Sequence, residues 1–283
     1  MSKTGYNYCA DLVKRNDVDR YLSTLFAPRD KRPLLFALYA FAVEIAQTRF
    51  RVSEPMLGEI RYQWWREAVE GLFAGAPRRH EVINALAQTL QRQPLPQAPF
   101  GALIDAHARD LNETPLITPE DLLLYGQALS FPVMMLAALI LTRGEKCADL
   151  EIAVCSAARA VSITQLLRSL PGHLARGQCI IPQEILAHHA AELETMGAGM
   201  WDTSCARALH ELIGLARSEM QSARAELRQI PDDALPVFLP LRLCEVYLKL
   251  MSRPDFNPLR HTANVSLAGR QLRMIAAMLT RRL

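Results

Sequence analysis

Closely spaced cysteines are missing from this sequence, and their absence sets the first limits on what the protein can be. The six cysteines among 283 residues are scattered, with no C-x-x-C pair and no cysteine–histidine spacing of the kind that holds structural zinc. We therefore expect neither a disulfide framework nor a structural zinc site, and we expect a reducing compartment. The 13 glycines and 17 prolines are near-average numbers, which excludes a collagen-like or low-complexity chain.

Targeting signals and strong charge are also missing. Residues 1–17 contain no apolar run like that of a secretory signal, and they hold too few arginines for a transit peptide. We therefore expect a cytoplasmic protein. The formal net charge of +3 is too small to indicate a nucleic-acid partner. The charge is uneven, however, because residues 256–283 hold five arginines and no acid, which leaves −2 for the rest of the chain.

Helical patterns account for most of what is present. Half of the residues are hydrophobic, enough for a large core, and no alternating strand pattern, hairpin signal or internal repeat is found. We predict an all-α protein with a single domain over residues 1–283. Helices are predicted over 34–48, from Pro55 to near Gly75, around Asp105 and Asp110, from Thr118 onward, and over 149–170, 203–229, 234–251 and 266–283.

One stretch is long enough to raise the question of a membrane span. Residues 122–142 carry no charge, and about 20 apolar residues can cross a bilayer. Gln127, Ser130 and the mid-segment Pro132 argue against a membrane span, and the unbroken apolar run covers only 131–141. We therefore predict a buried core helix rather than a membrane span.

Familiar catalytic and nucleotide-binding motifs, such as a Walker loop, G-x-G-x-x-G, H-E-x-x-H and G-x-S-x-G, do not occur. His188 and Glu192 share a helix face, which is more typical of a solvated pair than of a metal site. Glu44 is the lone charge in the first predicted helix, and a buried acid must be paired or neutralised. We expect it to pair with an arginine of a neighbouring helix, such as Arg168 or Arg159. A ligand site at Glu44 is the alternative.

Around these residues the sequence resembles the squalene/phytoene synthase family, and the likeness covers nearly the whole chain. The first family motif, roughly Y-A-F-C-R-x-x-D-D-x-x-D, matches at residues 39–41, and the family's W-x-x-E helix matches at residues 64–67. The aspartate positions of that first motif hold Ala46, Gln47 and Phe50.

A second family motif, roughly Q-L-x-N-x-x-R-D-x-x-x-D followed by R-G-x-x-Y-L-P, is kept in part. Arg168 and Arg176 stand at its arginine positions, while its aspartate positions hold Ser169 and His173. The resemblance is therefore strong for the frame of both motifs and weak for their acids.

The resemblance implies the class I isoprenoid synthase fold, a helical bundle in which two aspartate-rich helices hold Mg²⁺ and substrate diphosphates across a cavity. Mg²⁺ requires hard oxygen ligands, usually carboxylates, which alanine and phenylalanine cannot supply. We therefore expect no catalytic residue, no metal and no cofactor. What should remain is a vestigial cavity, with a substrate-binding remnant formed by Tyr39, Glu44, Arg168 and Arg176.

The departures from the motifs themselves resemble a divergent branch of the family, which includes a mitochondrial assembly factor of respiratory complex I. The strings FALYAFAVEIAQ and LRSLPGHLARGQCIIPQEI carry this likeness. It implies a bacterial, non-catalytic protein whose partners are complex I subunits or assembly intermediates. The alternative is a head-to-head prenyltransferase whose Mg²⁺ is held by other acids, namely Glu44, Glu67, Asp105 and Asp110.

Residues 266–283 are predicted to form an amphipathic helix. Its apolar face holds Ala268, Leu272, Ile275, Leu279 and Leu283, while Arg270, Arg273 and Arg281 lie away from that face. Such a helix can lie on anionic lipid, which would bring the protein to the inner face of the cytoplasmic membrane. The sequence favours the other arrangement, in which the apolar face packs on the core and the arginines are solvated.

Overall fold

The computed structural model describes residues 4–52, 54–111, 114–144, 148–227 and 230–281. Within these residues the regular secondary structure is helical and contains no strand, as predicted. The α-helices in chain order are α1 (Thr4–Asn16), α2 (Val18–Thr24), α3 (Arg32–Thr48), α4 (Pro55–Phe73), α5 (Glu81–Arg92), α6 (Ala98–Ala108), α7 (Pro119–Leu141), α8 (Ala148–Arg168), α9 (Leu170–Leu174), α10 (Gln183–His189), α11 (Leu193–Gly197), α12 (Thr203–Glu226), α13 (Leu235–Met251) and α14 (Leu267–Thr280). Short 3₁₀ helices lie at η1 (Arg49–Arg51), η2 (Arg109–Leu111) and η4 (Asp232–Ala234).

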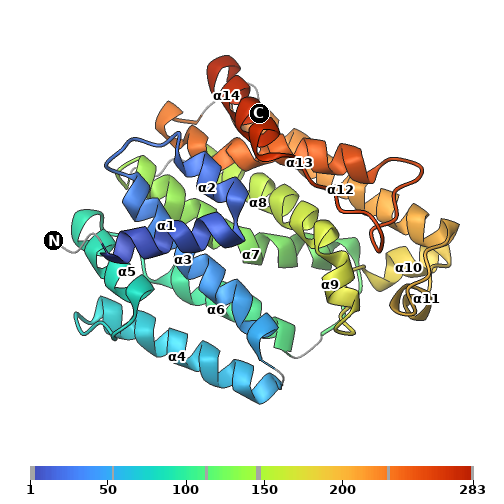
Figure 1. The fold of residues 1–283 in the computed structure, drawn as a ribbon, viewed down its shortest axis with the longest axis horizontal. Helices are drawn as coiled ribbons and strands as arrows, with labels where there is room; N and C mark the ends of the chain where they lie inside the picture. Colours follow the sequence, from blue (N-terminus) through green and yellow to red (C-terminus); the bar gives the residue numbers. More distant parts are fainter. Residues whose placement is uncertain (1–3, 53, 112–113, 145–147, 228–229, 282–283) are drawn as a thin grey trace.

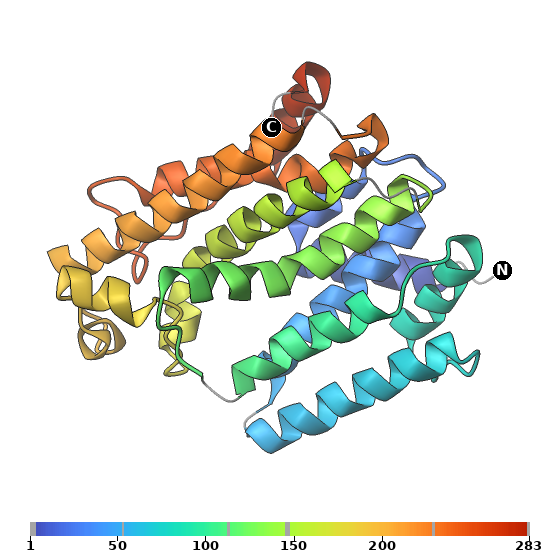
Figure 2. The same ribbon diagram turned by 180° about the vertical axis from the view of Figure 1, so that it is seen from behind.

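The long helices form two layers. Seen from behind, α4, α6, α7, α8 and α12 lie in a row, each packed against the next (Figure 2). On the other side α3 and α13 cover this row, α1 packs outside α3, and α2 and α14 pack against α13 (Figure 1). The two layers leave a space between the end of α3 and the end of α8, and the site described below lies there.

α3 is the central helix of the N-terminal half. Every side chain from Leu34 to Ile45 is buried, Glu44 included. A helix that is apolar all round has no face for solvent, so neighbours must cover every side, and α1, α4, α5, α6 and α7 do so. Pro33 stands in its first turn, where the missing N–H is no loss.

α7 begins as its sequence predicts and runs through the core. Thr118 is the N-cap and forms a capping box with Asp121, and hydrogen bonds from the Thr118 and Ile117 amides lower the pKa of the Asp121 carboxyl. Both α7 and residues 150–168 of α8 are long and apolar enough to cross a membrane, but 72% and 67% of their most apolar windows are buried inside the protein. Residues 122–142 therefore belong to a core helix, as predicted.

α14 docks the opposite way from the arrangement that the sequence favours. Its buried side is formed by Met274 and Ala277 together with Arg270, whose side chain is only 11% exposed. The predicted apolar face points outward, and the described members of that face, Ala268, Leu272, Ile275 and Leu279, are exposed. Leu283 lies outside the described residues. The hydrogen-bonded pair of Arg270 with Asp19 of α2 accounts for this orientation. Met274 and Ala277 lie one and two turns after Arg270 on the same face of the helix, so they are buried with it.

Candidate functional site

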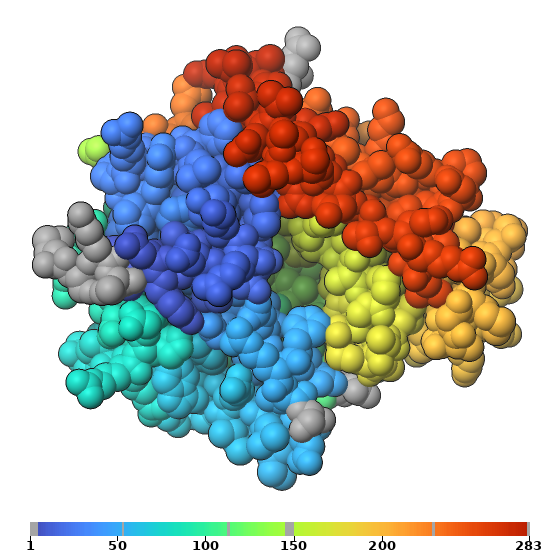
Figure 3. Space-filling view, in the orientation of Figure 1, coloured from blue at the N-terminus to red at the C-terminus, as the bar shows by residue number. Residues whose placement is uncertain are grey.

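A cavity of about 230 Å³ lies between the ends of α3 and α8. In the space-filling view it is a hollow near the centre of the face, between the blue N-terminal helices, the yellow α9 and the orange-red C-terminal helices, with green residues of α7 at its floor (Figure 3). Four of the five degenerate motif positions line it, namely Ala46, Phe50, Ser169 and His173. The two motif segments, far apart in the sequence, thus meet in one cavity.

The end of α8 shapes one wall of this cavity. α8 stops at Arg168, and the chain turns at Ser169 into the short α9, which has Pro171 in its first turn. The helix predicted over 149–170 ends near this point, and the chain continues into a second, short helix in which His173 is buried. Burial lowers the pKa of His173, and a neighbouring Arg176 adds to that effect, whereas its hydrogen bond with Gln178 opposes it. A neutral imidazole therefore stands where the family motif has an acid.

Arg176 packs on the ring of Phe50, which lines the cavity, although Arg176 itself does not line it. The centre of its guanidinium is 4.2 Å from the ring centroid, and the edge of the His173 ring approaches the same phenyl ring. The Nε and Nη2 atoms of Arg176 are buried without a hydrogen-bond partner, and burial together with the nearby Arg49 lowers its pKa. The arginine is thus held by an aromatic face rather than by a carboxylate.

The other three residues predicted to form the cavity remnant contact different parts of the protein. Tyr39 is buried beneath the guanidinium of Arg20, and burial raises the pKa of its hydroxyl to about 12. Glu44 pairs with Arg51 at 2.8 Å rather than with Arg168 or Arg159. Neither lines the cavity. The charge of Glu44 adds to the effect of burial in raising the pKa of the Tyr8 hydroxyl in α1, and it opposes the lowering by burial of the pKa of His80 at the start of α5.

Arg168 is fully engaged inside the protein. It donates hydrogen bonds to the Ala263 carbonyl at 3.1 Å and to Gln165 at 2.8 Å, and it lies 3.8 Å above the ring of Tyr247. It also lies 3.8 Å from Asp19. These contacts join α8 to α13 and α2 through the arginine, and Arg168 does not line the cavity; its part in ligand binding stays a prediction. Gln47, the fifth degenerate position, is likewise turned away from the cavity and bonds to Asn16 and Arg51.

Asp19 is a candidate functional residue that the sequence analysis did not identify. Its carboxylate lines the cavity, is almost fully buried, and accepts hydrogen bonds from Arg270 at 2.7 Å and from the Tyr247 hydroxyl at 2.9 Å. Burial raises its pKa, while Arg270, Tyr247 and Arg168 hold that rise in check. An acid in a short helix gives no local signal, because its partners are more than a hundred residues away.

Three acids line the cavity, and each already has a protein partner: Asp17 pairs with Arg20, Asp19 pairs with Arg270, and Asp110 bonds to Tyr125. Asp110, the one alternative ligand that lines the cavity, accepts a hydrogen bond from the Tyr125 hydroxyl at 2.6 Å. Asp105 and Glu67 pair with Arg66 and Arg78 outside the cavity. The degenerate positions offer a methyl group, a phenyl ring, a hydroxyl and an imidazole, not the carboxylates that Mg²⁺ needs to bridge to a diphosphate. The donor set of this cavity therefore differs from a Mg²⁺–diphosphate site.

A second cavity of about 370 Å³ adjoins the first. Asp110, Tyr125, His173 and Gln178 line both cavities, so these side chains form the partition between them. The second cavity extends towards α10, where Gln183 and Leu186 line it. Burial, together with the hydrogen-bonded Asp110, raises the pKa of Tyr125, so the partition holds a neutral phenol beside a carboxylate.

Comparison with known proteins adds the following findings. Residues 13–271 match the family model described as squalene/phytoene synthase. The chain is 28% identical over 250 residues to "NADH dehydrogenase (ubiquinone) complex I, assembly factor 6" of Rattus norvegicus, covering 88% of this chain and 74% of that protein. It is 25% identical over 288 residues to the 15-cis-phytoene synthase of Synechococcus elongatus, covering 97% and 92%. A crystal structure of a dehydrosqualene synthase with bound ligand superposes with a TM-score of 0.81 at 17% identity, covering 99% of this chain and 96% of that one, which shows a shared fold.

Proposed function

Because the chain belongs to the squalene/phytoene synthase family, we propose that it is a non-catalytic member that assists the assembly of respiratory complex I at the inner face of the cytoplasmic membrane. Two lines of support meet here. Four of the degenerate motif positions line the cavity with no acid among them, and the Rattus norvegicus relative, described as a complex I assembly factor, matches over 88% of this chain.

The proposal that the protein is non-catalytic rests on one set of contacts, in which Arg176 and His173 pack against the ring of Phe50. In a diphosphate enzyme, cations near these motif positions would have to face the leaving group, with Mg²⁺ bridging carboxylates to its oxygens. Here Phe50 occupies a ligand position and its ring covers the guanidinium of Arg176 at 4.2 Å. A phenyl ring can bind neither Mg²⁺ nor phosphate, so this motif position supplies no metal ligand, and its ring also covers one face of the guanidinium that the motif keeps.

The outer face of α14 supports a peripheral position on the membrane. Leu272, Ile275 and Leu279 expose 66%, 43% and 80% of their surface, and Arg273 and Arg281 lie on the same short helix. An exposed apolar stripe beside arginines can enter the boundary of an anionic bilayer while the basic groups meet its headgroups. The buried face of α14 stays attached to the protein through Met274 and Ala277, so the helix need not unfold to bind.

Affinity purification from the native membrane fraction tests the assembly role. Complex I subunits are expected to co-purify with the tagged protein, and deletion of the gene should lower the amount of assembled complex I on a native gel. A normal complex I level after deletion, with no complex I subunit captured, would overturn the assembly role.

Sedimentation with anionic vesicles tests the membrane face. The variant Leu272→Glu/Leu279→Glu should leave the vesicle fraction. A matched control is Leu124→Glu/Ile152→Glu, which adds the same charges at exposed apolar positions of α7 and α8 and should still bind. Equal binding by both variants would reject α14 as the membrane-binding face.

The alternative activity is head-to-head prenyl transfer with unorthodox ligands, and the persistence of the cavity together with the 25% identity to a phytoene synthase keeps it testable. The purified protein should form no condensed prenyl product from farnesyl or geranylgeranyl diphosphate in the presence of Mg²⁺. Product formation by the wild type that is lost in Asp110→Asn would establish this activity and remove the non-catalytic proposal.

A further inference from the structure

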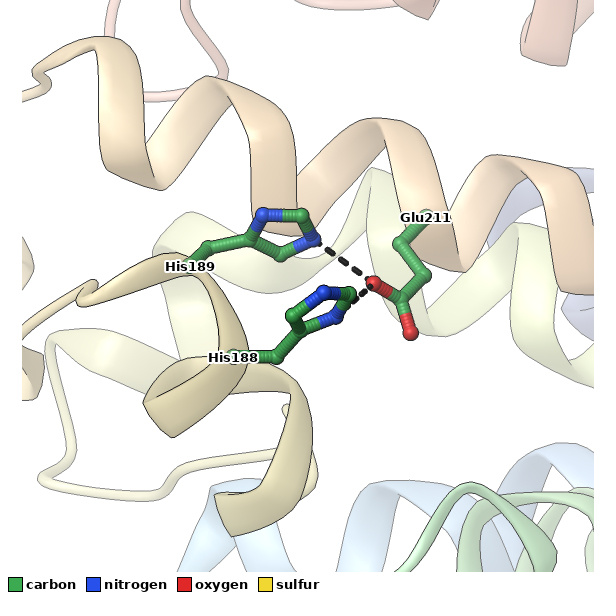
Figure 4. Close-up of side chains that lie close together, drawn as sticks. All are labelled: His188, His189 and Glu211. Atoms are coloured by element: carbon green, nitrogen blue, oxygen red, sulfur yellow. Dashed lines mark hydrogen bonds and ion pairs between the residues drawn. The ribbon is translucent and has the colours of Figure 1, made fainter.

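His188, His189 and Glu211 converge on the outer side of the molecule, away from the cavity described above. His188 and His189 end α10, and Glu211 projects from α12 towards both rings (Figure 4). The same carboxylate oxygen, Oε2 of Glu211, lies 3.1 Å from Nδ1 of His188 and 2.6 Å from Nε2 of His189. The two imidazole rings stack with their centroids 4.5 Å apart.

This convergence is unusual for adjacent residues of a helix. Successive side chains of an α-helix point about 100° apart, so two neighbours do not ordinarily reach one atom. Here His188 uses its near ring nitrogen and His189 its far one, which brings both nitrogens to the same side of the carboxylate. The three potential ligand atoms lie within 4.8 Å of one another, and among the described residues this is the one group of three His, Cys, Asp or Glu side chains with that property.

We propose that His188, His189 and Glu211 form a zinc-binding site that joins α10 to α12. Two imidazole nitrogens and one carboxylate oxygen are the donor set of catalytic-type zinc sites, which leave one position open. Zinc bonds of about 2.0–2.1 Å in tetrahedral geometry place ligand atoms about 3.3 Å apart. The observed separations of 3.1 Å and 2.6 Å reach that geometry through small side-chain rotations that open the group around the metal.

The burial of the three residues suits a bound ion with an open side. The side chains of His189 and Glu211 are 17% and 37% exposed, so both are partly fixed by the protein, while His188 is 70% exposed and leaves room for a water or an added ligand. All three offer nitrogen or carboxylate oxygen and none offers sulfur, which favours zinc over metals that prefer thiolates.

A metal at this position would hold one wall of the second cavity. α10 contributes Gln183 and Leu186 to that cavity, and it is a short helix of seven residues packed on α12. Zinc between His189 and Glu211 would tie the end of α10 to the middle of a 24-residue helix. The site is independent of the proposed assembly role, because it shares no residue with the degenerate cavity or with α14.

Titration of the full chain with Zn²⁺, after treatment with a chelator, tests the proposal. One Zn²⁺ per chain should bind, and Co²⁺ in its place should give the visible absorption of a four-coordinate ion without a sulfur-to-cobalt charge-transfer band, which separates this site from the free cysteines. His189→Ala and Glu211→Gln should each weaken binding by more than the roughly 10–100-fold that loss of an outer-shell partner costs.

His210→Gln is the matched control, because His210 neighbours Glu211 on α12 but contacts the carbonyls of Ala206 and Ser252 instead. It should bind Zn²⁺ like the wild type. Hydrogen exchange of residues 183–189 gives a second readout, since zinc should slow it in the wild type and not in Glu211→Gln. The proposal is overturned if the wild type binds no Zn²⁺, or if Glu211→Gln and His189→Ala bind Zn²⁺ as tightly as the wild type does. Either result would show a hydrogen-bonded cluster without a metal.

Discussion

Removing Arg270 tests the buried ion pair that fixes α14. Nη1 of Arg270 lies 2.7 Å from the carboxylate of Asp19, and the two side chains are 11% and 6% exposed. We choose Arg270→Met because methionine keeps the apolar part of the side chain and removes the charge. The substitution leaves Asp19 buried with Tyr247 and a more distant Arg168 as its partners.

The expected loss follows from this burial. Removing one partner of a buried ion pair costs about 3–5 kcal/mol, and because Tyr247 still donates to Asp19, we expect the lower end, about 3 kcal/mol. For a chain of this size that loss lowers Tm by roughly 6–12 °C. The matched control is Arg273→Met on the same helix. The Arg273 guanidinium donates a hydrogen bond to the Gly269 carbonyl one turn earlier, so its loss should cost little.

The pH dependence of the loss has a definite sign. Burial already raises the pKa of Asp19 above its usual value of 3.8, and removing Arg270 raises it further. A carboxyl with a raised pKa stabilises the fold most fully at low pH, where it is protonated, and this stability is lost as pH rises through its folded pKa. The gap between Arg270→Met and wild type should therefore be small at acid pH and widen towards neutral pH.

Urea unfolding at several pH values measures this gap. The double variant Asp19→Asn/Arg270→Met, which leaves no acid at position 19, should recover much of the stability lost by Arg270→Met alone. The reasoning is refuted if the gap does not change with pH, if the double variant is no more stable than Arg270→Met, or if Arg273→Met loses as much.

Three further predictions concern α3 and the cavity. Glu44→Gln should cost only about 0.2–1 kcal/mol in urea unfolding, because the side chain of its partner Arg51 is 42% exposed and solvent screens the pair; a loss near 3 kcal/mol would contradict this. Phe50→Ala should cost about 0.5–1 kcal/mol, mainly its contact with Arg176, because the residue is 53% exposed; a loss of the size seen for buried aromatic residues, about 3–5 kcal/mol, would show that the ring fills the core. Restoring the acids by the combined change Ala46→Asp, Phe50→Asp, Ser169→Asp and His173→Asp should give Mg²⁺-dependent binding of a farnesyl diphosphate analogue in calorimetric titration, since all four positions line the same cavity. A folded variant that binds no analogue would show that the cavity no longer admits the substrate.

Much of the secondary structure could be predicted because its causes are local. The run from Leu34 to Ile45 is apolar on every side, which leaves burial as its one stable arrangement. Thr118, Pro119 and Asp121 supply a cap, a first-turn proline and an acid within four residues, so the start of α7 is fixed by neighbours in sequence. Shorter helices such as α2 and α9 were not predicted, because a few turns give too short a pattern.

The positions of the degenerate motifs were also predictable, because the residues that match the two family motifs identify equivalent positions in a known fold. Ala46, Phe50, Ser169 and His173 were predicted to replace the acids of one site, and they line one cavity. The substrate-binding remnant was not predictable in the same way. A match to a motif gives the position of a residue along a helix, but the orientation of its side chain depends on tertiary contacts. Arg168, for example, packs on the ring of Tyr247.

Sequence alone therefore determined where most of the long helices form and that the aspartates of the family motifs are replaced, since both follow from the identity of residues at neighbouring or matching positions. Only the tertiary structure decided which groups meet. Asp19 and Arg270 are 251 residues apart, and their contact turns the apolar face of α14 outward. Glu44 pairs with Arg51 rather than with Arg168, and His188 contacts Glu211 rather than Glu192. Such pairs depend on how whole helices pack, because the packing brings together side chains whose sequence neighbours carry no trace of the contact.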